Sequence, residues 1–574
     1  MERDSITLSL CMIVKDEEDN LNDCILPVKS VFDEIIVVDT GSKDKTPQIA
    51  RALGARVYRF KWIDDFSAAR NESIRHATSD YIMWLDADDR MKREEIEKLK
   101  TLKSQLPFSK DVAYFLILHS HSTLDGDMSM YQLRIFPNID GISFEGAIHE
   151  NISASLKRRG IRFEFKDIVI DHKGYQDREA VLKKINRNLE IAKRHLKANP
   201  NDPILIFHVA RTLSAVEKYR DAINYLRLIT EDNRFLKKAR DLFHYAAFYR
   251  VKYHLEINEL DEAKRFLERI DKDFSDSPVL SLFMGITLYK LKEYERAIYY
   301  IKRSLKNEIN VSRFPLNLNQ IYFNQYFILA MAHIHLNRKK EAEEYLLKSV
   351  NIPYKEVFRA YEELGKLYLQ TGRYDKAVQC FKKAIELGRR IDINYSNLGL
   401  SYKKLGDRNN AIEAFNEALK LNPKRSEALL NLAHIYFEKG DLHKAEELFK
   451  EALKCDNNFI DAHLVLSEIY FRFGNYEDLI EECNQIIKIL SIQKDFEIND
   501  ISDLGTVYYH IGCILKEHKR FDLALLAYYV AFLISPEEDL MDEIINFSKE
   551  INRLDITLSK IKDILSFYNI NLSN

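Results

Sequence analysis

The sequence predicts an α/β domain followed by an all-α repeat array, and three observations carry this prediction. Over roughly the first 175 residues, short apolar runs alternate with helical patterns, which is typical of βαβ units and a largely parallel sheet. From about residue 200 the strand patterns stop, and small residues recur with a period of 34. A chain of 574 residues also exceeds the size of one hydrophobic core, so we expect two or more domains.

The composition excludes several classes of protein. The 86 basic and 89 acidic residues nearly cancel, which argues against a nucleic-acid surface made by bulk charge. The six cysteines include no C-x-x-C pair, so neither a disulfide framework nor a structural zinc site is expected. No run approaches the roughly 18 apolar residues of a membrane span. We therefore expect a cytoplasmic protein without nucleic-acid partners or membrane insertion.

The elements of the first domain follow one another at short spacing. Gly41 permits a tight turn after the second strand, Asp44 can cap the next helix, and Pro47 fits the first turn of that helix. The predicted elements are a strand at 8–14, a helix at 21–31, a strand at 34–38, a helix ending at 53, a strand at 56–60, a helix at 70–77 and a strand at 81–85.

Carboxylates follow the last of these strands. Asp86 and Asp88 stand two residues apart, so in an extended segment both side chains leave on the same side, whereas Asp89 is expected to point the other way and to be structural. Two oxygen donors at a strand end suit Mg²⁺ or Mn²⁺. Asp39 ends another strand, and ligands of parallel sheets bind beyond such carboxyl ends. The alternative is an acidic loop, because a D-x-D sequence is common by chance.

Four motifs in this order carry a resemblance to a known family. They are MIVKDEE at 12–18, VVDTGSKDKT at 37–46, FSAARN at 66–71 and WLDADD at 84–89. Together they resemble the family 2 glycosyltransferases with the GT-A fold, in the bacterial branch with helical repeats that includes flagellin-type and bacteriocin-peptide glycosyltransferases. The likeness covers about residues 6–190. One departure is Asp16, where the family usually has Asn.

The resemblance implies a glycosyltransferase of inverting, metal-dependent type that takes a hexose or N-acetylhexosamine from a UDP-sugar. By this resemblance Asp39 would bind the uracil or ribose, and Lys15 and Glu17 would line the same base pocket. Arg70 would serve the nucleotide or its diphosphate, since its charge is fixed. The alternatives are that Asp39 caps a turn and that Arg70 forms a surface salt bridge.

The resemblance also implies a metal site. Asp86 and Asp88 would hold Mn²⁺ or Mg²⁺ against the diphosphate, with Asp86 shared between the metal and the nucleotide sugar. His172 follows an apolar run at 168–170 and would complete the set of metal ligands. The alternative for His172 is a structural role, as for most single histidines.

The acceptor half of the site is expected at residues 111–175, with strands at 112–118 and 131–137. By motif position Glu150 would be the general base that deprotonates the acceptor, with His149 beside it. Arg134 is counted among the residues that bind the nucleotide sugar, and the alternative is that Glu150 only orients Arg134 or a sugar hydroxyl.

Two further histidines, His119 and His121, share one face of a predicted strand. No motif supports either as a metal ligand, and both are assigned to the acceptor cleft or the surface.

The second half of the chain contains an internal repeat in which a small residue is followed twelve positions later by Ala. From Gly365 to Ser467 the period of 34 does not slip. The pairs are Ala210/Ala222, Gly285/Ala297, Ala330/Ala342, Gly365/Ala377, Gly399/Ala411, Ala433/Ala445 and Gly512/Ala524, with more degenerate copies at Val251/Ala263 and Ser467/Leu479. This pattern resembles the tetratricopeptide repeat in about nine copies, each a pair of antiparallel helices.

The expected layout is therefore an α/β GT-A nucleotide-sugar transferase domain followed by an all-α tetratricopeptide-repeat superhelix. The boundaries are 1–176 for the transferase domain, 177–202 for a helical connector, 203–538 for the repeats and 539–574 for capping helices.

The repeat array suggests the kind of acceptor, because the concave face of stacked helix pairs can hold an extended peptide. We expect a protein or peptide acceptor, either Ser/Thr of a flagellin-like protein or Cys/Ser of a bacteriocin peptide. Asn394, Asn397 and Asn431 could form a polar ladder that grips its backbone, or be ordinary solvated residues. The alternatives are transfer to a cell-wall or capsule glycan, and a repeat scaffold with an inactive transferase domain. The sequence is also compatible with a homodimer.

Overall fold

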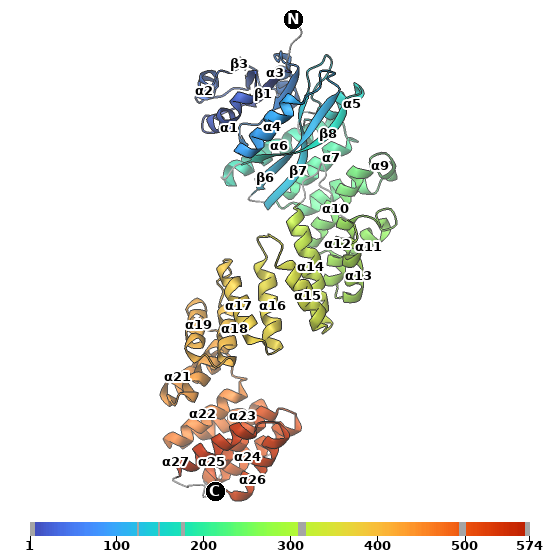
Figure 1. Cartoon of the computed structure of the whole chain (residues 1–574). Coiled ribbons are helices and arrows are strands. Elements are labelled where there is room, and N and C mark those ends of the chain that lie inside the picture. The colour runs from blue at the N-terminus through green and yellow to red at the C-terminus, as the bar shows by residue number, and fades with distance from the viewer. Residues whose placement is uncertain are drawn as a thin grey trace. The chain divides into compact units, whose positions relative to one another are not determined.

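A computed structural model describes residues 6–122, 126–146, 150–173, 178–307, 317–492 and 501–568 (Figure 1). The chain divides into two compact units, Met1–Tyr354 and Lys355–Asn574. The division falls inside the predicted repeat array, because the first repeats belong to the same compact unit as the α/β domain. Among the described residues, no helix has the length and apolar content needed to cross a membrane.

The α/β domain is built on one eight-stranded sheet with the strand order β3-β2-β1-β4-β7-β6-β8-β5. Its strands are β1 (Leu8–Val14), β2 (Glu34–Asp39), β3 (Arg56–Arg59), β4 (Tyr81–Trp84), β5 (Asp89–Arg90), β6 (Val112–Ser122), β7 (Gly126–Pro137) and β8 (Arg162–His172). The first four strands are mutually parallel, whereas β7 is antiparallel to both β4 and β6. The predicted parallel sheet is thus parallel over one half and mixed over the other.

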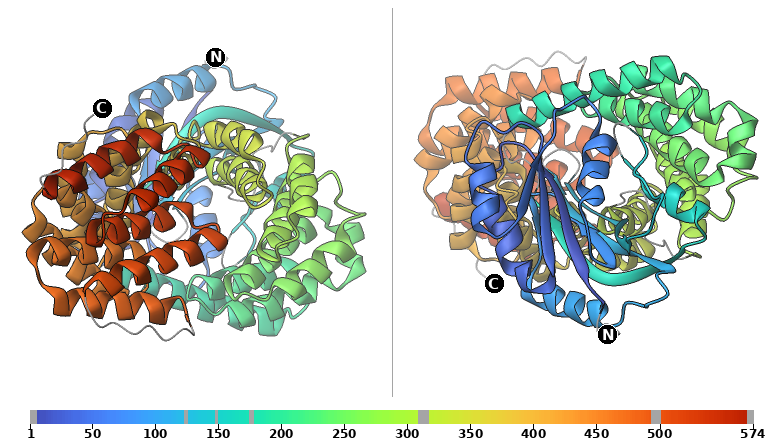
Figure 2. Two further views of the ribbon diagram at one scale, coloured as in Figure 1. Left: turned by 90° about the horizontal axis from the view of Figure 1, so that it is seen from below. Right: turned by 90° about the horizontal axis from the view of Figure 1, so that it is seen from above.

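Helices cover both faces of the sheet, as the right-hand view of Figure 2 shows for the parallel strands. They are α1 (Leu21–Val28), α2 (Thr46–Ala52), α3 (Phe66–Arg75), α4 (Arg93–Ser104) and α5 (Ser153–Arg158), with a short 3-10 turn at Lys29–Val31. Alternate residues of the strands enter two separate cores, so that Met83 packs on the side of α1 and α4 and Trp84 on the side of α3 and α5.

Helix α3 begins four residues before the predicted start. The Asp65 carboxylate accepts a hydrogen bond from the Ala68 N–H at 2.9 Å and caps the helix. Arg70 therefore lies in the second turn of α3 rather than at its beginning. At the amino end of the same helix, Phe66 packs against the hydrophobic core of the first repeats.

The repeats follow α6 (Arg178–Ala198), and the nine small-residue pairs of the sequence each join the two helices of one antiparallel pair. The pairs are α7 (Pro203–Ser214) with α8 (Tyr219–Thr230), α10 (Arg240–Glu256) with α11 (Leu260–Ile270), α12 (Pro278–Lys290) with α13 (Tyr294–Ser304), α14 (Leu318–His335) with α15 (Lys339–Ser349), α16 (Phe358–Gln370) with α17 (Tyr374–Glu386), α18 (Asp392–Lys404) with α19 (Arg408–Leu421), α20 (Ser426–Glu438) with α21 (Leu442–Cys455), α22 (Ile460–Phe473) with α23 (Tyr476–Ile489), and α24 (Ile501–Glu517) with α25 (Phe521–Ile534).

Three other helices lie outside these pairs. A short helix, α9 (Asn233–Lys238), precedes α10, and α26 (Glu538–Glu550) and α27 (Leu554–Phe567) follow the last pair. The repeat spacing lengthens by eleven residues between Gly285 and Ala330 and between Ser467 and Gly512, which predicts insertions around 310–320 and 491–502. Both segments fall in large part outside the described residues.

The small residues let the two helices of a pair approach closely. A Cβ atom added at Gly399 would lie 2.8 Å from Cδ1 of Phe415 on the partner helix, nearer than side-chain carbons pack. Gly365 stands in the same relation to Phe381, and Gly512 to Tyr528. The glycine on one helix therefore makes room for a large ring on the other.

The predicted asparagine ladder is wrong at Asn394, one of its three positions. Asn394 is only 1% exposed, and its amide donates to Glu362 Oε1 at 2.7 Å and to the Arg389 carbonyl at 3.0 Å. Asn431 accepts from Lys403 Nζ at 3.1 Å. Asn394 therefore stabilises the packing of neighbouring repeats, and its burial keeps it from a peptide in the groove.

The close approach at Gly399 can be tested by enlarging the residue. We expect Gly399→Leu to destabilise the C-terminal unit by about 1–3 kcal/mol, because the new side chain must displace the Phe415 ring. The control is Lys404→Leu, an exposed position on the same helix. Thermal unfolding followed by circular dichroism should show a lower transition temperature for Gly399→Leu alone, and equal transitions would contradict the packing argument.

Candidate active site

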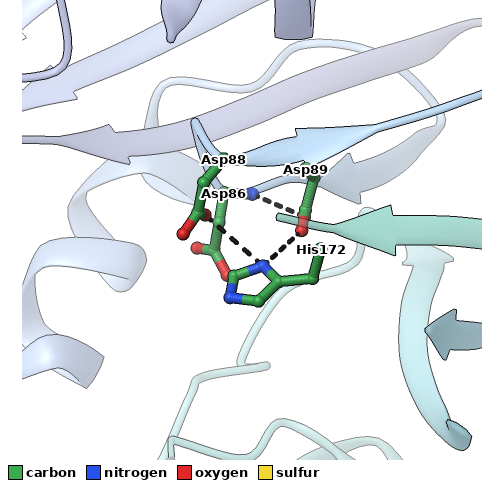
Figure 3. A group of neighbouring side chains, drawn as sticks. All are labelled: Asp86, Asp88, Asp89 and His172. Carbon is green, nitrogen blue, oxygen red and sulfur yellow. Dashed lines mark hydrogen bonds and ion pairs between the residues drawn. The ribbon is translucent and has the colours of Figure 1, made fainter. Parts of the chain in front are cut away.

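A tight turn at the end of β4 gathers the carboxylates of the site (Figure 3). The Asp89 N–H donates to the Asp86 carbonyl at 3.0 Å, and the Asp86 N–H donates to Asp89 Oδ2 at 2.9 Å. Strand β5 then pairs with the end of β8 so that Asp89 lies opposite His172. The carboxylates of Asp86, Asp88 and Asp89 and the imidazole of His172 bring their ligand atoms within 4.8 Å of one another.

His172 is held by two of these carboxylates. Its Nδ1 lies 2.9 Å from Asp89 Oδ1 and 3.4 Å from Asp88 Oδ1. Burial lowers the pKa of His172, but the hydrogen bond to Asp89 and the charges of Asp88 and Asp86 outweigh burial and raise the pKa above its ordinary value. The predicted grouping of Asp86, Asp88 and His172 is therefore present in the structure.

Asp89 departs from its predicted orientation. Strand alternation would direct its side chain away from Asp86 and Asp88, but the turn after β4 reverses the chain between Asp86 and Asp89. The Asp89 carboxylate is buried, and it connects His172 to Arg134, whose Nη1 lies 2.8 Å from Asp89 Oδ2. Sequence reasoning missed Asp89 as a member of the cluster because it assumed extended backbone through the whole motif.

Arg134 also differs from its predicted role as a nucleotide-sugar ligand. Its side chain is 1% exposed, and its guanidinium carbon lies 3.9 Å from the ring centre of Trp84. Nη1 donates both to Asp89 and to the Trp84 carbonyl. Because protein groups enclose its guanidinium, Arg134 does not fit the predicted role of a nucleotide-sugar ligand. Its positive charge instead compensates the negative charge of the carboxylates.

Arg70 connects the carboxylate cluster to Glu150. Its Nη2 donates to Asp86 Oδ1 at 2.8 Å and its Nε to Glu150 Oε1 at 2.6 Å. The Arg70 side chain is 5% exposed, and its guanidinium also lies against the Trp84 ring at 3.9 Å. Burial raises the pKa of Asp86, but the charges of Arg70 and Arg134 outweigh it and hold the pKa well below its ordinary value.

Glu150 is paired with Arg70 and not with Arg134, the residue that it was alternatively expected to orient. The Glu150 side chain is 13% exposed, so it is not fully enclosed by the protein. Its predicted neighbour His149 lies outside the described residues. His119 donates or accepts a hydrogen bond with Ser129 Oγ at 2.8 Å across β6 and β7, and the side chain of His121 is outside the described part.

The residues that were predicted to bind the base and ribose lie in the loops after β1 and β2. Asp39 is 4% exposed at the end of β2, and its Oδ1 accepts from the Ser42 N–H at 2.9 Å, as expected of a turn-capping residue. Glu17 accepts from the Asn20 amide at 2.8 Å, and Lys15 is exposed. Because β1 separates β2 from β4, Asp39 at the end of β2 lies about two strand spacings, or ~10 Å, from the end of β4.

Asp16 has a left-handed backbone conformation with φ of 54°. Asp and Asn are the residues, besides Gly, that most readily adopt this conformation. The Asp16 carboxylate accepts from the Lys43 N–H at 2.7 Å, and its own N–H donates to Ser42 Oγ at 2.9 Å. Asp16 therefore supports the left-handed backbone conformation at this position, as the Asn that is usual in the family would.

The charges and donors of the site fit a divalent cation. The site holds four carboxylates and two guanidinium groups, from Asp86, Asp88, Asp89, Glu150, Arg70 and Arg134. With a neutral His172, these groups sum to two negative charges. Mn²⁺ accepts both carboxylate oxygens and an imidazole as ligands. Mg²⁺ prefers oxygen ligands, so it suits the carboxylates but not the imidazole.

Comparison with known proteins agrees with both parts of the chain. Residues 9–109 match the glycosyl transferase family 2, and residues 326–355, 356–424 and 396–458 match tetratricopeptide repeats. The chain therefore carries a family 2 glycosyltransferase domain followed by tetratricopeptide repeats.

Two relatives illustrate how far the similarity extends. A TPR repeat-containing protein of Synechococcus elongatus is 42% identical over 150 residues, which cover 26% of this chain and 36% of that protein. The SPbeta prophage-derived glycosyltransferase SunS of Bacillus subtilis is 26% identical over 375 residues, which cover 61% of this chain and 85% of SunS. This chain thus spans about a third of the first relative and most of the second.

Among solved structures, MamA is similar over 30% of this chain and 95% of the MamA chain, at 24% identity and with a TM-score of 0.27.

The metal site can be tested at Asp88. We expect Asp88→Asn to weaken Mn²⁺ binding at least tenfold in calorimetry, because the substitution removes a charged oxygen donor from the cluster. Asp167→Asn is the matched control, since Asp167 is 83% exposed on the same strand as His172. Equal Mn²⁺ affinity in Asp88→Asn and wild type would remove Asp88 from the metal site.

Proposed function

We propose that this chain is an inverting, metal-dependent glycosyltransferase that moves a hexose or N-acetylhexosamine from a UDP-sugar to a side chain of a protein or peptide. The observation that carries the proposal is the cluster of Asp86, Asp88 and His172 at the carboxyl end of β4, inside the domain that matches family 2 glycosyltransferases. Such a cluster would hold a divalent cation, and the cation would in turn attract the diphosphate of the donor.

The donor binds across the carboxyl ends of β1, β2 and β4 in this proposal. Lys15, Glu17 and Asp39 hold the base and ribose from the loops after β1 and β2. Asp86, Asp88 and His172 hold Mn²⁺ or Mg²⁺, and the cation supplies neutralisation of the charge that develops on the departing UDP.

The chain's own residues activate the acceptor. The Glu150 carboxylate removes the proton from an acceptor hydroxyl or thiol, and the resulting oxygen or sulfur forms a bond to the anomeric carbon. The bond from that carbon to the diphosphate oxygen breaks, and its electron pair leaves on UDP, so that the configuration inverts. Arg70 donates to Glu150 through Nε and to Asp86 through Nη2, and it thereby holds the base at a fixed distance from the donor site.

The repeats are assigned to the acceptor. The alignment with SunS is 375 residues long, so it extends beyond the transferase domain into the repeats. A sugar-transfer domain fused to a peptide-binding array favours either Ser/Thr of a flagellin-like protein or Cys/Ser of a bacteriocin peptide. The six free cysteines fit a reducing compartment, and we place the reaction in the cytoplasm.

The role of Glu150 can be tested by an isosteric substitution. We expect Glu150→Gln to lower transfer by about 10²–10⁴-fold, the usual contribution of a positioned base, while UDP affinity stays within a few-fold. Intact mass spectrometry of flagellin-like and bacteriocin acceptors co-expressed with each variant measures transfer, and calorimetry with UDP and Mn²⁺ measures binding. Unchanged transfer would exclude Glu150 as the base.

The assignment of the acceptor to the repeats can be tested with the first compact unit. We expect a chain ending at Tyr354 to hydrolyse UDP-sugar slowly, because the whole candidate site lies in this unit. The same chain should fail to modify an acceptor that the full chain modifies. Normal modification by the truncated chain would show that the C-terminal unit takes no part in acceptor binding.

A further inference from the structure

We propose that Asn71 and Ser67 of helix α3 are positioning residues that hold the segment 144–146, and through it Glu150, against Arg70. The inference rests on the proposed function for the meaning of Glu150, but its contacts stand independently of that function. It assigns a task to two residues of the motif at 66–71 other than Arg70.

Asn71 makes a two-point contact with a single backbone position. Its Nδ2 donates to the Phe144 carbonyl at 3.0 Å, and the Phe144 N–H donates to Asn71 Oδ1 at 2.7 Å. The side-chain amide thus pairs with Phe144 as a neighbouring strand residue would, although 73 residues separate them in sequence. Asp at this position could accept but not donate, and Ala could do neither.

Ser67 adds a second anchor one turn earlier on the helix. Its hydroxyl donates to the Gly146 carbonyl at 2.6 Å, and its side chain is buried. Arg70 and Asn71 follow Ser67 by three and four residues, so all three lie on one face of α3. This face therefore contacts Phe144, Gly146 and Glu150 together.

A β-bridge also connects the segment 144–146 to the residue that follows Glu150. Glu145 and Asn151 form a two-hydrogen-bond bridge, with N···O distances of 3.0 and 2.9 Å. Phe144 is buried, and its ring meets the Trp84 ring edge-on at 6.2 Å. Since both sides of the bridge are tied to α3, a shift of Phe144 would also shift Glu150 relative to Arg70 and Asp86.

The experiment compares Asn71→Ala and Ser67→Ala with a matched control, Asn138→Ala, in the full-length chain. The Asn138 amide also donates to backbone carbonyls, those of Ala77 and Ser79. It lies at the opposite end of β4 from Asp86, because Asn138 pairs with Asp80 just before that strand. The control therefore removes the same chemistry at a place remote from Glu150.

Hydrogen exchange measures the anchoring directly. We expect the Phe144 amide to exchange about tenfold faster in Asn71→Ala, as for loss of one buried hydrogen bond, and to be unchanged in Asn138→Ala. We expect Ser67→Ala to accelerate the same segment less, because its anchor holds a carbonyl and not an amide. Exchange at Phe144 that is the same in Asn71→Ala and wild type would overturn the proposal.

Kinetics measures the consequence for the reaction, with UDP-hexose hydrolysis in the presence of Mn²⁺ as the readout. We expect kcat to fall about tenfold in Asn71→Ala while KM for UDP-hexose stays within twofold, because the donor loops are untouched. A kcat equal to that of wild type, or an equal loss in Asn138→Ala, would overturn a positioning role. A wild-type chain that neither binds nor hydrolyses UDP-hexose would overturn the proposed function, and the exchange comparison would still decide whether Asn71 holds Phe144.

Discussion

The buried guanidinium of Arg70 is the interaction on which the site depends. It donates hydrogen bonds to both Asp86 and Glu150, and it lies against the Trp84 ring. Removing one partner of a buried ion pair leaves an uncompensated charge, which typically costs several kcal/mol. A lysine could not replace Arg70, because a single ammonium cannot reach two carboxylates in the fixed geometry of the guanidinium fork. The two halves of the candidate site are thus connected by one planar cation.

The charge balance of the site explains why a second arginine is buried beneath it. Asp89 and His172 lie between Arg134 and the other carboxylates, so Arg134 lowers the electrostatic cost of bringing three aspartates together without occupying the donor side. The charges of Arg70 and Arg134 hold the pKa of Asp86 well below its ordinary value, and the four carboxylates of the site outnumber its two guanidinium groups, which leaves negative charge to bind a cation. Support from behind the ligands is a common property of metal centres.

Most of the strands, the repeats and the grouping of Asp86, Asp88 and His172 follow from the sequence, because each depends on a local pattern or a motif, whereas the two-residue strand β5 was not predicted. The first strand was predicted with the bounds that the structure has, since Leu8–Val14 is apolar apart from Ser9 and is followed by charged residues. The role of Asp89 did not follow, because the prediction assumed extended backbone, whereas hydrogen bonds between Asp86 and Asp89 close a turn there. The burial of Arg134 and the contact of Asn71 with Phe144 could not be predicted, since both join residues far apart in the chain.

Helix α3 has one consequence for how the two parts of this protein can vary. Its first residue, Phe66, belongs to the packing of the repeats, and its second turn carries Arg70. Only about 6 Å of rigid helix separates these two residues. The transferase domain and the repeats are therefore not interchangeable modules: a chimaera joined at residue 202 would need to inherit the surface that receives Phe66 as well. The core formed by the buried residues from Ala411 to Leu565 contains no described residue of α3, so substitutions in that core do not directly disturb the helix that carries Arg70.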